Sequence, residues 1–257
     1  TTAQRGTETP PTEPETRGCS VAPGGSSASG STEEPGRAAA STLRVRLPVR
    51  WLGPIFNPSG YASEAINFIL PLSHRLNMGI CHNNNLLSKK FLADLPEMDR
   101  NRLFALQDKF ALISSGIVIS HNPAHGFVVM PDAVFNIGLT MFETDRIAPS
   151  WVSCGNQMDE MWVPSQFNLE TFAASGVERD KLVVMPGAVD ALVYDPAKHA
   201  PLPLPHRAAF NFLSIFEWSS RKAWDVLLAA YLREFSGEDD VCLYLRTYLF
   251  NKPDGDP

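Results

Sequence analysis

Residues 44–70 read RVRLPVRWLGPIFNPSGYASEAINFIL, and this pattern indicates the fold class. The β-branched and apolar residues of 44–51 predict a strand, and the glycines and prolines of 52–60 predict a loop. The next segment is predicted to be a helix, because its apolar residues follow the i, i+3, i+4 spacing of one helix face: Ala62, Ala65, Ile66, Ile69 and Leu70. Strand, glycine loop and helix open a doubly wound α/β unit, in which ligands bind outside the carboxyl ends of the strands.

The rest of the first half alternates between strand-like and helix-like segments. Continuous apolar runs predict buried strands, and a proline in the first turn or a serine N-cap predicts where a helix begins. By these criteria the expected strands are 112–120, 134–142, 162–163 and 181–185, and the expected helices are 96–109 and 165–176. This alternation is typical of a parallel sheet covered by helices.

The second half repeats the pattern once, with a strand expected at 210–216, a helix carrying Trp224 to Phe235, and a strand at 241–250. Residues 210–257 number 48, whereas an ordinary domain has about 100–150. We therefore expect a chain truncated at its C-terminal end. The predicted organisation is a tail at 1–42, an N-terminal domain at 43–195, a proline-rich linker at 196–209 and an incomplete second domain at 210–257.

The tail is predicted to be disordered. Residues 1–42 contain one large apolar residue, Val21, against fourteen Ser and Thr, six Gly and five Pro. Such a composition cannot offset the roughly 1–2 kcal/mol per residue of backbone ordering entropy. A transit peptide is the alternative, although the glutamates at 8, 13, 15, 33 and 34 are wrong for an acid-poor import signal.

Charge and composition exclude several classes of partner. The 257 residues carry 22 Lys and Arg against 28 Asp and Glu, a net charge of −6, which argues against a nucleic-acid or anionic-membrane surface. No apolar run approaches 18 residues, so we expect no transmembrane segment.

The four cysteines form no C-x-x-C pair and indicate neither a zinc site nor a disulfide framework. The cytoplasm is the default location, with plastid or Golgi association left open.

His121 and His125 lie just after the strand predicted at 112–120. His121 follows a predicted strand directly, and is either a residue of the ligand cleft or a hydrogen-bonded structural histidine. His125 is four positions later, but Pro123 and Gly126 argue against a helical metal face. His74 and His82 belong to no recognisable pattern, so no role is predicted for them.

Three other segments carry candidate site residues, each with a structural alternative. The loop Gly53–Gly60 either brings backbone N–H groups to a phosphate or is simply a tight turn, and it is not G-x-G-x-x-G. Glu143 and Asp145 lie just past a predicted strand, where they either orient a sugar hydroxyl and stabilise a cationic transition state or hold a loop with an arginine. Asp159 and Glu160 are expected on the solvated face of a helix.

Arg221 and Lys222 are expected at the start of the second-half helix. Two cations and free helix N–H groups would meet there, which suits a diphosphate. Cations at a helix N-terminus oppose the macrodipole by roughly 0.3–1 kcal/mol each. The pair is therefore either a diphosphate site or a mildly unfavourable surface feature.

Taken together, six short strings resemble the retaining GT-B glycosyltransferases that use nucleotide sugars, the group called glycosyl transferase family 4 or group 1. In order, the strings are 53–60, FETDR at 142–146, MDEMWVPS at 158–165, SGV at 175–177, VD at 189–190 with YDP at 194–196, and FEWSSRK at 216–222. Each string is weak alone, but their order and spacing match over most of the chain beyond the tail.

The resemblance implies two Rossmann-like domains that face each other across a cleft, with the acceptor on the first and the nucleotide sugar on the second. It implies that Gly60 approaches the donor diphosphate, that Lys222 binds it with Arg221 beside it, and that no metal or other cofactor is needed. Glu143 and Asp145 stand where relatives keep a residue near the transferred sugar, and are predicted to be catalytic. Cations suit the leaving diphosphate, where negative charge develops.

Several positions depart from the family pattern. Glu217 stands where many relatives have arginine, and Ala188 and Ala223 stand where glycine is common. The distal donor domain, with its paired glutamates, is missing. We predict a glycosyltransferase that moves a sugar from a nucleotide donor to an unknown acceptor, with retention. The alternative is a non-catalytic binding or scaffold protein derived from this fold; an oxidoreductase is disfavoured because no G-x-G-x-x-G follows either opening strand.

Overall fold

A computed structural model describes residues 20–21, 46–84 and 86–248. It divides into two compact units, Thr1–Val189 and Asp190–Pro257. The tail predicted at 1–42 lies outside the described residues, except for Ser20–Val21. Those two residues form β1, which pairs in parallel with β5 (Val128–Val129).

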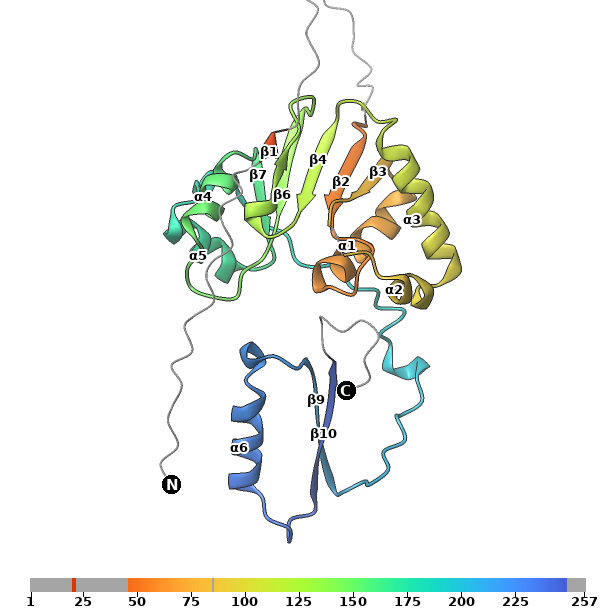
Figure 1. The fold of residues 1–257 in the computed structure, drawn as a ribbon, viewed down its shortest axis with the longest axis vertical. Coiled ribbons are helices and arrows are strands. Elements are labelled where there is room, and N and C mark those ends of the chain that lie inside the picture. Colours follow the sequence, from red (N-terminus) through yellow and green to blue (C-terminus); the bar gives the residue numbers. More distant parts are fainter. Residues whose placement is uncertain (1–19, 22–45, 85, 249–257) are drawn as a thin grey trace, which may run out of the picture. The chain divides into compact units, whose positions relative to one another are not determined.

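The first unit contains a six-stranded, entirely parallel sheet in the order β3-β2-β4-β6-β7-β8 (Figure 1). The strands are β2 (Val49–Gly53), β3 (Met78–His82), β4 (Ile117–His121), β6 (Phe135–Leu139), β7 (Glu160–Val163) and β8 (Leu182–Val184). The helices are α1 (Gly60–Ser73), α2 (Lys89–Asp94), α3 (Glu97–Phe110), α4 (Pro149–Asn156) and α5 (Gln166–Ser175). The predicted Rossmann-like α/β class is confirmed.

Local sequence explains where the principal helices begin and end. The Ser59 side chain accepts a hydrogen bond from the Ala62 N–H at 3.1 Å and caps α1. Ser165 caps α5 in the same way at 3.3 Å. At the other end of α5, Gly176 takes the left-handed conformation, with φ of 113°, that glycine adopts without strain. The predicted N-cap at Ser165 and the predicted end near Gly176 are therefore confirmed.

Two apolar clusters hold the first unit together. In the first, α1 and α3 pack against β2, β3, β4 and β6 around fully buried residues such as Trp51, Ile69 and Leu103. In the second, α4 and α5 pack against β7 and β8 around Met161 and Phe172. The buried positions Ala62, Ala65, Ile66 and Ile69 of α1 belong to the face that the apolar spacing predicted.

The structure corrects several local expectations. Strand β3 and helix α2 were not predicted, because β3 contains only five residues and lies between polar segments. The strand expected at 112–120 begins at Ile117, since Ser115 and Gly116 both have positive φ and break the extended run. Glu160 begins β7 and accepts a hydrogen bond from the Trp162 indole, so it does not lie on a solvated helix.

The remaining corrections concern Asp159 and the cysteines. Asp159 precedes β7 and accepts the Asn136 N–H at 2.7 Å, which ties the start of β7 to β6. The cysteine spacing indicated no disulfide, but Cys154 is disulfide-bonded. Cys81 and Cys242 are free thiols. Among the described helices, none combines the length and the hydropathy that crossing a bilayer requires.

The second unit contains a pair of parallel strands, β9 (Phe210–Glu217) and β10 (Val241–Tyr248), and the helix α6 (Trp224–Glu234). Phe212 of β9 meets the rings of Tyr231 and Phe235, which fixes α6 on one face of the strand pair. The predicted strand, helix and strand are confirmed here. A single 3₁₀ turn, η3 (Pro196–Lys198), lies within the segment that leads to β9.

Candidate functional site

The order of the strands marks one place on the sheet where a ligand site is expected. The chain runs from β2 to β3 on one side, and then returns past β2 to form β4 on the other side. The connections that leave the carboxyl ends of β2 and β4 therefore diverge. In open α/β sheets, ligands bind in the crevice at such a switch point. The last residues of the two strands are Gly53 and His121.

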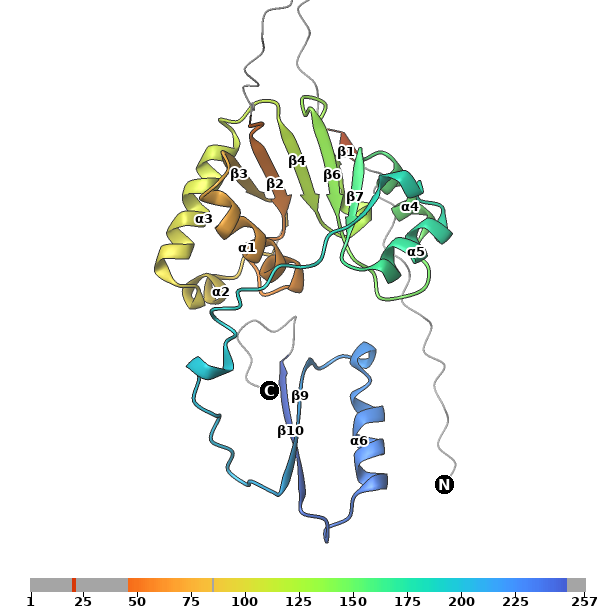
Figure 2. The same cartoon turned by 180° about the vertical axis from the view of Figure 1, so that it is seen from behind.

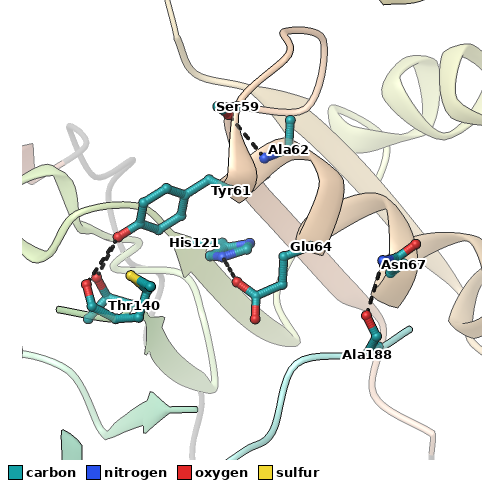
Figure 3. Close-up of polar contacts among 9 residues, drawn as sticks. Ser59, Tyr61, Ala62, Glu64, Asn67, His121, Thr140 and Ala188 are labelled. Atoms are coloured by element: carbon teal, nitrogen blue, oxygen red, sulfur yellow. Dashed lines mark hydrogen bonds and ion pairs between the residues drawn. The ribbon is translucent and has the colours of Figure 1, made fainter. Parts of the chain in front are cut away.

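Four side chains meet at this point, and we call them the switch-point cluster: Tyr61, Glu64, His121 and Thr140. Figure 3 shows Tyr61 and Glu64 projecting from α1 on either side of the His121 ring. The Glu64 Oε2 atom lies 3.2 Å from His121 Nε2, and the Tyr61 hydroxyl lies 3.1 Å from Thr140 Oγ1. The ring centroids of Tyr61 and His121 are 5.1 Å apart.

The contacts of His121 define its hydrogen-bonding state. Because a carboxylate only accepts, the Nε2 atom carries a proton and donates it to Glu64. The other ring nitrogen, Nδ1, is buried and has no hydrogen-bond partner among the described residues. The Trp51 ring packs edge-on against the imidazole at 5.6 Å, and His121 has no exposed surface. The imidazole is thus held firmly, with one unused polar atom.

Tyr61 is partly exposed, as Glu64 is, whereas His121 and Thr140 are buried. Burial raises the pKa of the Tyr61 hydroxyl, and the negative charges of Glu64 and Glu143 act in the same direction, against the hydrogen bonds to Thr140 and the Met141 carbonyl. The hydroxyl is therefore protonated at neutral pH. In this state it can both donate and accept a hydrogen bond, as a ligand hydroxyl requires.

The segment after β8 borders the cluster. It runs along the carboxyl edge of the sheet to α1, as Figure 2 shows. The Asn67 side chain donates to the Ala188 carbonyl at 3.0 Å. A β-carbon on Gly187 would come within 2.9 Å of the Glu64 carboxylate. Glu64 is therefore enclosed on one side by His121 and on the other by this segment.

Gly60 is the predicted site residue that lies nearest to the cluster along the chain. It is the first residue of α1, next to Tyr61, and it is exposed. A β-carbon placed on it would meet no atom within 4 Å, so there is open space beside the helix start. The first N–H groups of a helix have no partners within the helix and attract anions. The structure thus puts an accessible helix start beside the switch-point cluster.

Glu143 and Asp145 lie in the exposed loop after β6, three residues and more beyond Thr140. Glu143 is close enough for its charge to raise the pKa of Tyr61. The loop itself is fixed through the Asn168 side chain, which donates to the Phe142 carbonyl at 2.6 Å. The structure therefore brings Glu143 toward the cluster.

Arg221 and Lys222 belong to the second unit, where both are exposed. They lie in a 3₁₀ turn, η4 (Ser220–Lys222), and so precede α6 instead of forming its first turn. Ala223 joins the turn to the helix in the left-handed conformation, with φ of 52°. Glycine adopts this backbone region without strain, whereas alanine does not. The two cations were expected in the first turn of the helix. This expectation is wrong, because they lie in the short turn that precedes α6.

Three members of the cluster were missed in the sequence: Tyr61, Glu64 and Thr140. Tyr61 and Glu64 are spaced i, i+3 on the first turn of the helix that follows the first strand, so polar residues at that spacing were the available signal. Thr140 directly follows β6, whereas the strand predicted at 134–142 included it, so the prediction hid its place at a strand end. Among the described residues, no group of three His, Cys, Asp or Glu side chains is placed to hold a metal ion.

Known structures share this architecture. HepE from Anabaena in complex with UDP-glucose matches with a TM-score of 0.51 at 15% identity, covering 81% of this chain and 63% of that chain. Its complex with UDP and glucose gives 0.50 at 12% identity with the same coverage. The lipopolysaccharide outer core galactosyltransferase WaaB gives 0.41 at 12% identity, covering 78% and 68%.

The described strands and helices share the α/β fold of the HepE structures. It spans 63% of the length of the HepE chain. No protein-family model matches the chain, and no curated protein sequence does either. The likeness therefore lies in the arrangement of strands and helices, which is of the α/β class that the sequence predicted.

Proposed function

We propose that this chain is part or all of a glycosyltransferase that moves a sugar from a nucleoside diphosphate donor to an acceptor, with retention and without a metal. The observation that carries the proposal is the switch-point cluster beside the open start of α1. The α/β fold shared with HepE, whose complexes contain UDP and UDP-glucose, supports the donor class.

The start of α1 would receive the donor diphosphate. Gly60 has no side chain, and a β-carbon at that position would point into open space, so a phosphate can approach the backbone closely. Negative charge grows on the leaving diphosphate as the bond to the sugar breaks. N–H dipoles fixed in advance at this end stabilise that charge without reorganisation.

The cluster would face the sugar and the acceptor. The Tyr61 hydroxyl, which is partly exposed and protonated, donates to or accepts from a sugar hydroxyl. His121 and Thr140 keep the Tyr61 ring and hydroxyl in place by ring contact and hydrogen bond. Glu143 and Asp145 orient the reacting sugars, and their negative charges favour the positive charge that develops on the anomeric carbon.

Arg221 and Lys222 are the cations proposed for the leaving diphosphate. Both are exposed, and they lie in η4 next to the start of α6. Lysine acts as a point charge toward phosphate, whereas arginine offers a planar fork of donors. In this proposal Lys222 carries the larger share, because it is the residue that matches the lysine of the family pattern.

Calorimetric titration with UDP-glucose, UDP, GDP-mannose and ADP-glucose tests the donor class, using the full-length gene product that contains residues 1–257. We expect one of these donors to bind with a micromolar Kd, and Gly60→Val to weaken that binding at least tenfold, or about 1.4 kcal/mol. Ser63→Val is the matched control, because Ser63 is an exposed residue in the same turn of α1. Absence of binding for every nucleotide would overturn the proposal and favour a scaffold protein.

A further inference from the structure

The loop between β2 and α1 is held by a histidine for which the sequence predicted no role. His82, the last residue of β3, directs its Nδ1 atom at two consecutive backbone amides. The Ile55 N–H lies 3.0 Å from this nitrogen, and the Phe56 N–H lies 3.3 Å from it. Both amides belong to buried residues, so the bonds are formed away from bulk water.

This geometry fixes the protonation state of His82. A nitrogen that accepts from two N–H groups must present its lone pair, so Nδ1 is unprotonated and the ring proton is on Nε2. The imidazole is therefore neutral. Burial lowers the pKa of His82, and the carbonyl of Leu86 opposes that shift. Among the described residues, no charged side chain contributes to this shift, and the Phe56 ring lies 5.3 Å from the imidazole.

The other anchors of the loop come from the same part of the chain. The Asn83 N–H donates to the Gly53 carbonyl at 3.2 Å, and the Ser88 N–H donates to the Phe56 carbonyl at 2.9 Å. His82, Asn83 and Ser88 therefore hold the first part of the loop, from Gly53 to Phe56. The loop leads directly into Ser59 and Gly60, where α1 begins.

We propose that His82 is a positioning residue, which sets the start of α1 by accepting hydrogen bonds from Ile55 and Phe56, and that acid releases the loop by protonating the accepting nitrogen. A protonated Nδ1 is itself a donor and faces two N–H donors, so all three groups lose their partners at once. A buried unpaired donor is costly, and the loop has to move to relieve it. The effect on donor binding rests on the proposed function, whereas the effect on the loop does not.

The sign of the pH dependence follows from the direction of the shift. The folded state lowers the pKa of His82 below its ordinary value of about 6.5. The unfolded or released state therefore takes up a proton first as the pH falls. The stabilising contribution of His82 is complete above about pH 6.5 and decreases as the pH falls below that value.

The test compares wild type with His82→Asn. An asparagine side-chain oxygen occupies nearly the place of the histidine Nδ1 and accepts hydrogen bonds, but it does not titrate in this range. Amide hydrogen exchange is measured at Ile55 and Phe56 at about pH 7.5 and about pH 5, each expressed as a protection factor. We expect at least a tenfold loss of protection at the lower pH in wild type, and no loss in His82→Asn. His74→Asn, at the exposed end of α1, is the control and should behave as wild type.

Nitrogen-15 NMR of the imidazole supplies a second readout that needs no variant. We expect shifts of a neutral ring protonated at Nε2 at about pH 7.5. A ring protonated at Nδ1, or protection of Ile55 and Phe56 that is equal at both pH values in wild type, would overturn the inference. Neither measurement uses a nucleotide sugar, so both are independent of the proposed function.

The effect of pH on binding of the nucleotide sugar is then measured separately. If the proposed function holds, the Kd for the bound donor should rise at least fivefold more between these two pH values in wild type than in His82→Asn. Because the two proteins bind the same nucleotide, titration of its phosphate cancels in the comparison. If acid lowers the protection of Ile55 and Phe56 but no nucleotide sugar binds, the proposed function is wrong and the role of His82 stands. If a nucleotide sugar binds but the protection does not depend on pH, the role of His82 is wrong and the proposed function stands.

Discussion

Gly53 lies so close to β4 that a β-carbon built on it would be 2.7 Å from the carbonyl oxygen of His121. The ends of β2 and β4 are in direct contact at the switch point, and glycine at position 53 is what permits it. The glycine that was expected to make room for a ligand thus makes room for a neighbouring strand. Gly60, seven residues later, is the glycine with open space beside it.

These two glycines give a matched pair of variants. Gly53→Ala should destabilise the first unit by about 1–3 kcal/mol, because the new methyl group overlaps the backbone of β4. Gly60→Ala should change the free energy of unfolding by less than about 1 kcal/mol, since its methyl group meets nothing. Urea denaturation monitored by circular dichroism measures both. Equal effects would contradict the close approach of the two strands.

Asp132 should make the stability of the first unit depend on acid. Arg50 is 4% exposed in β2, and its guanidinium lies 2.9 Å from the Asp132 carboxylate. The hydrogen bond from Arg50 lowers the pKa of Asp132, so the stabilisation is complete above the ordinary carboxyl pKa of about 3.9 and is lost as the pH falls through the lower folded value. Asp132→Asn should cost about 1 kcal/mol at pH 7, because the buried Arg50 cation loses a charged partner that is itself half exposed and screened by water.

The difference between Asp132→Asn and wild type should shrink as the pH falls below about 4, which urea midpoints at several pH values would reveal. Glu170→Gln is the control. Glu170 also pairs with an arginine, Arg179, whose hydrogen bond lowers the pKa of Glu170 to about 2, but both side chains are more than half exposed. An exposed pair contributes little to stability. A larger loss of stability from Glu170→Gln than from Asp132→Asn would contradict a stabilising role for the pair of Asp132 with the buried Arg50.

Ala223→Gly should stabilise the second unit by about 1 kcal/mol, because alanine is strained in the left-handed conformation and glycine is not. The same exchange at Ala229, an exposed position within α6, should instead destabilise by about 1 kcal/mol. Thermal unfolding of the second unit monitored through α6 distinguishes the two signs. Destabilisation by both variants would mean that Ala223 does not have a positive φ in solution.

Lys222→Ala should lower turnover at least tenfold, or about 1.4 kcal/mol, if the full-length protein transfers sugar as proposed. The reason is the loss of positive charge at the leaving diphosphate. Release of the nucleotide diphosphate, followed at saturating and at limiting donor, measures kcat and kcat/KM. Lys90→Ala, an exposed lysine of α2, should leave both unchanged. Unchanged kinetics in Lys222→Ala would refute its assigned role.

The elements that the sequence predicted are those with strong local signals. Helix α1 has both a serine cap and an apolar face, and α5 has a serine cap and a glycine end. β3 gave no such signal, since its five residues MGICH show neither alternation nor a long apolar run. It becomes a strand because its backbone pairs with β2, from Val49 opposite Met78 to Gly53 opposite His82. Such pairing is a property of the sheet and not of the segment.

The candidate site was predictable in position but only partly in residues. The rule for parallel sheets places a ligand at strand ends, and His121 was found that way. Glu64 and Tyr61 are part of the site because α1 turns them toward His121, and His82 matters because the backbone of a distant loop folds onto its ring. Contacts between residues 26 to 60 positions apart leave no local pattern to detect.

The hydrogen bond from Asn67 to the Ala188 carbonyl has a mechanical consequence. The polypeptide leaves the first unit beside its first helix, although its last strand is β8. Tension on the chain beyond Val189 would therefore be transmitted to α1, the helix that carries Tyr61 and Glu64, before it reached the sheet.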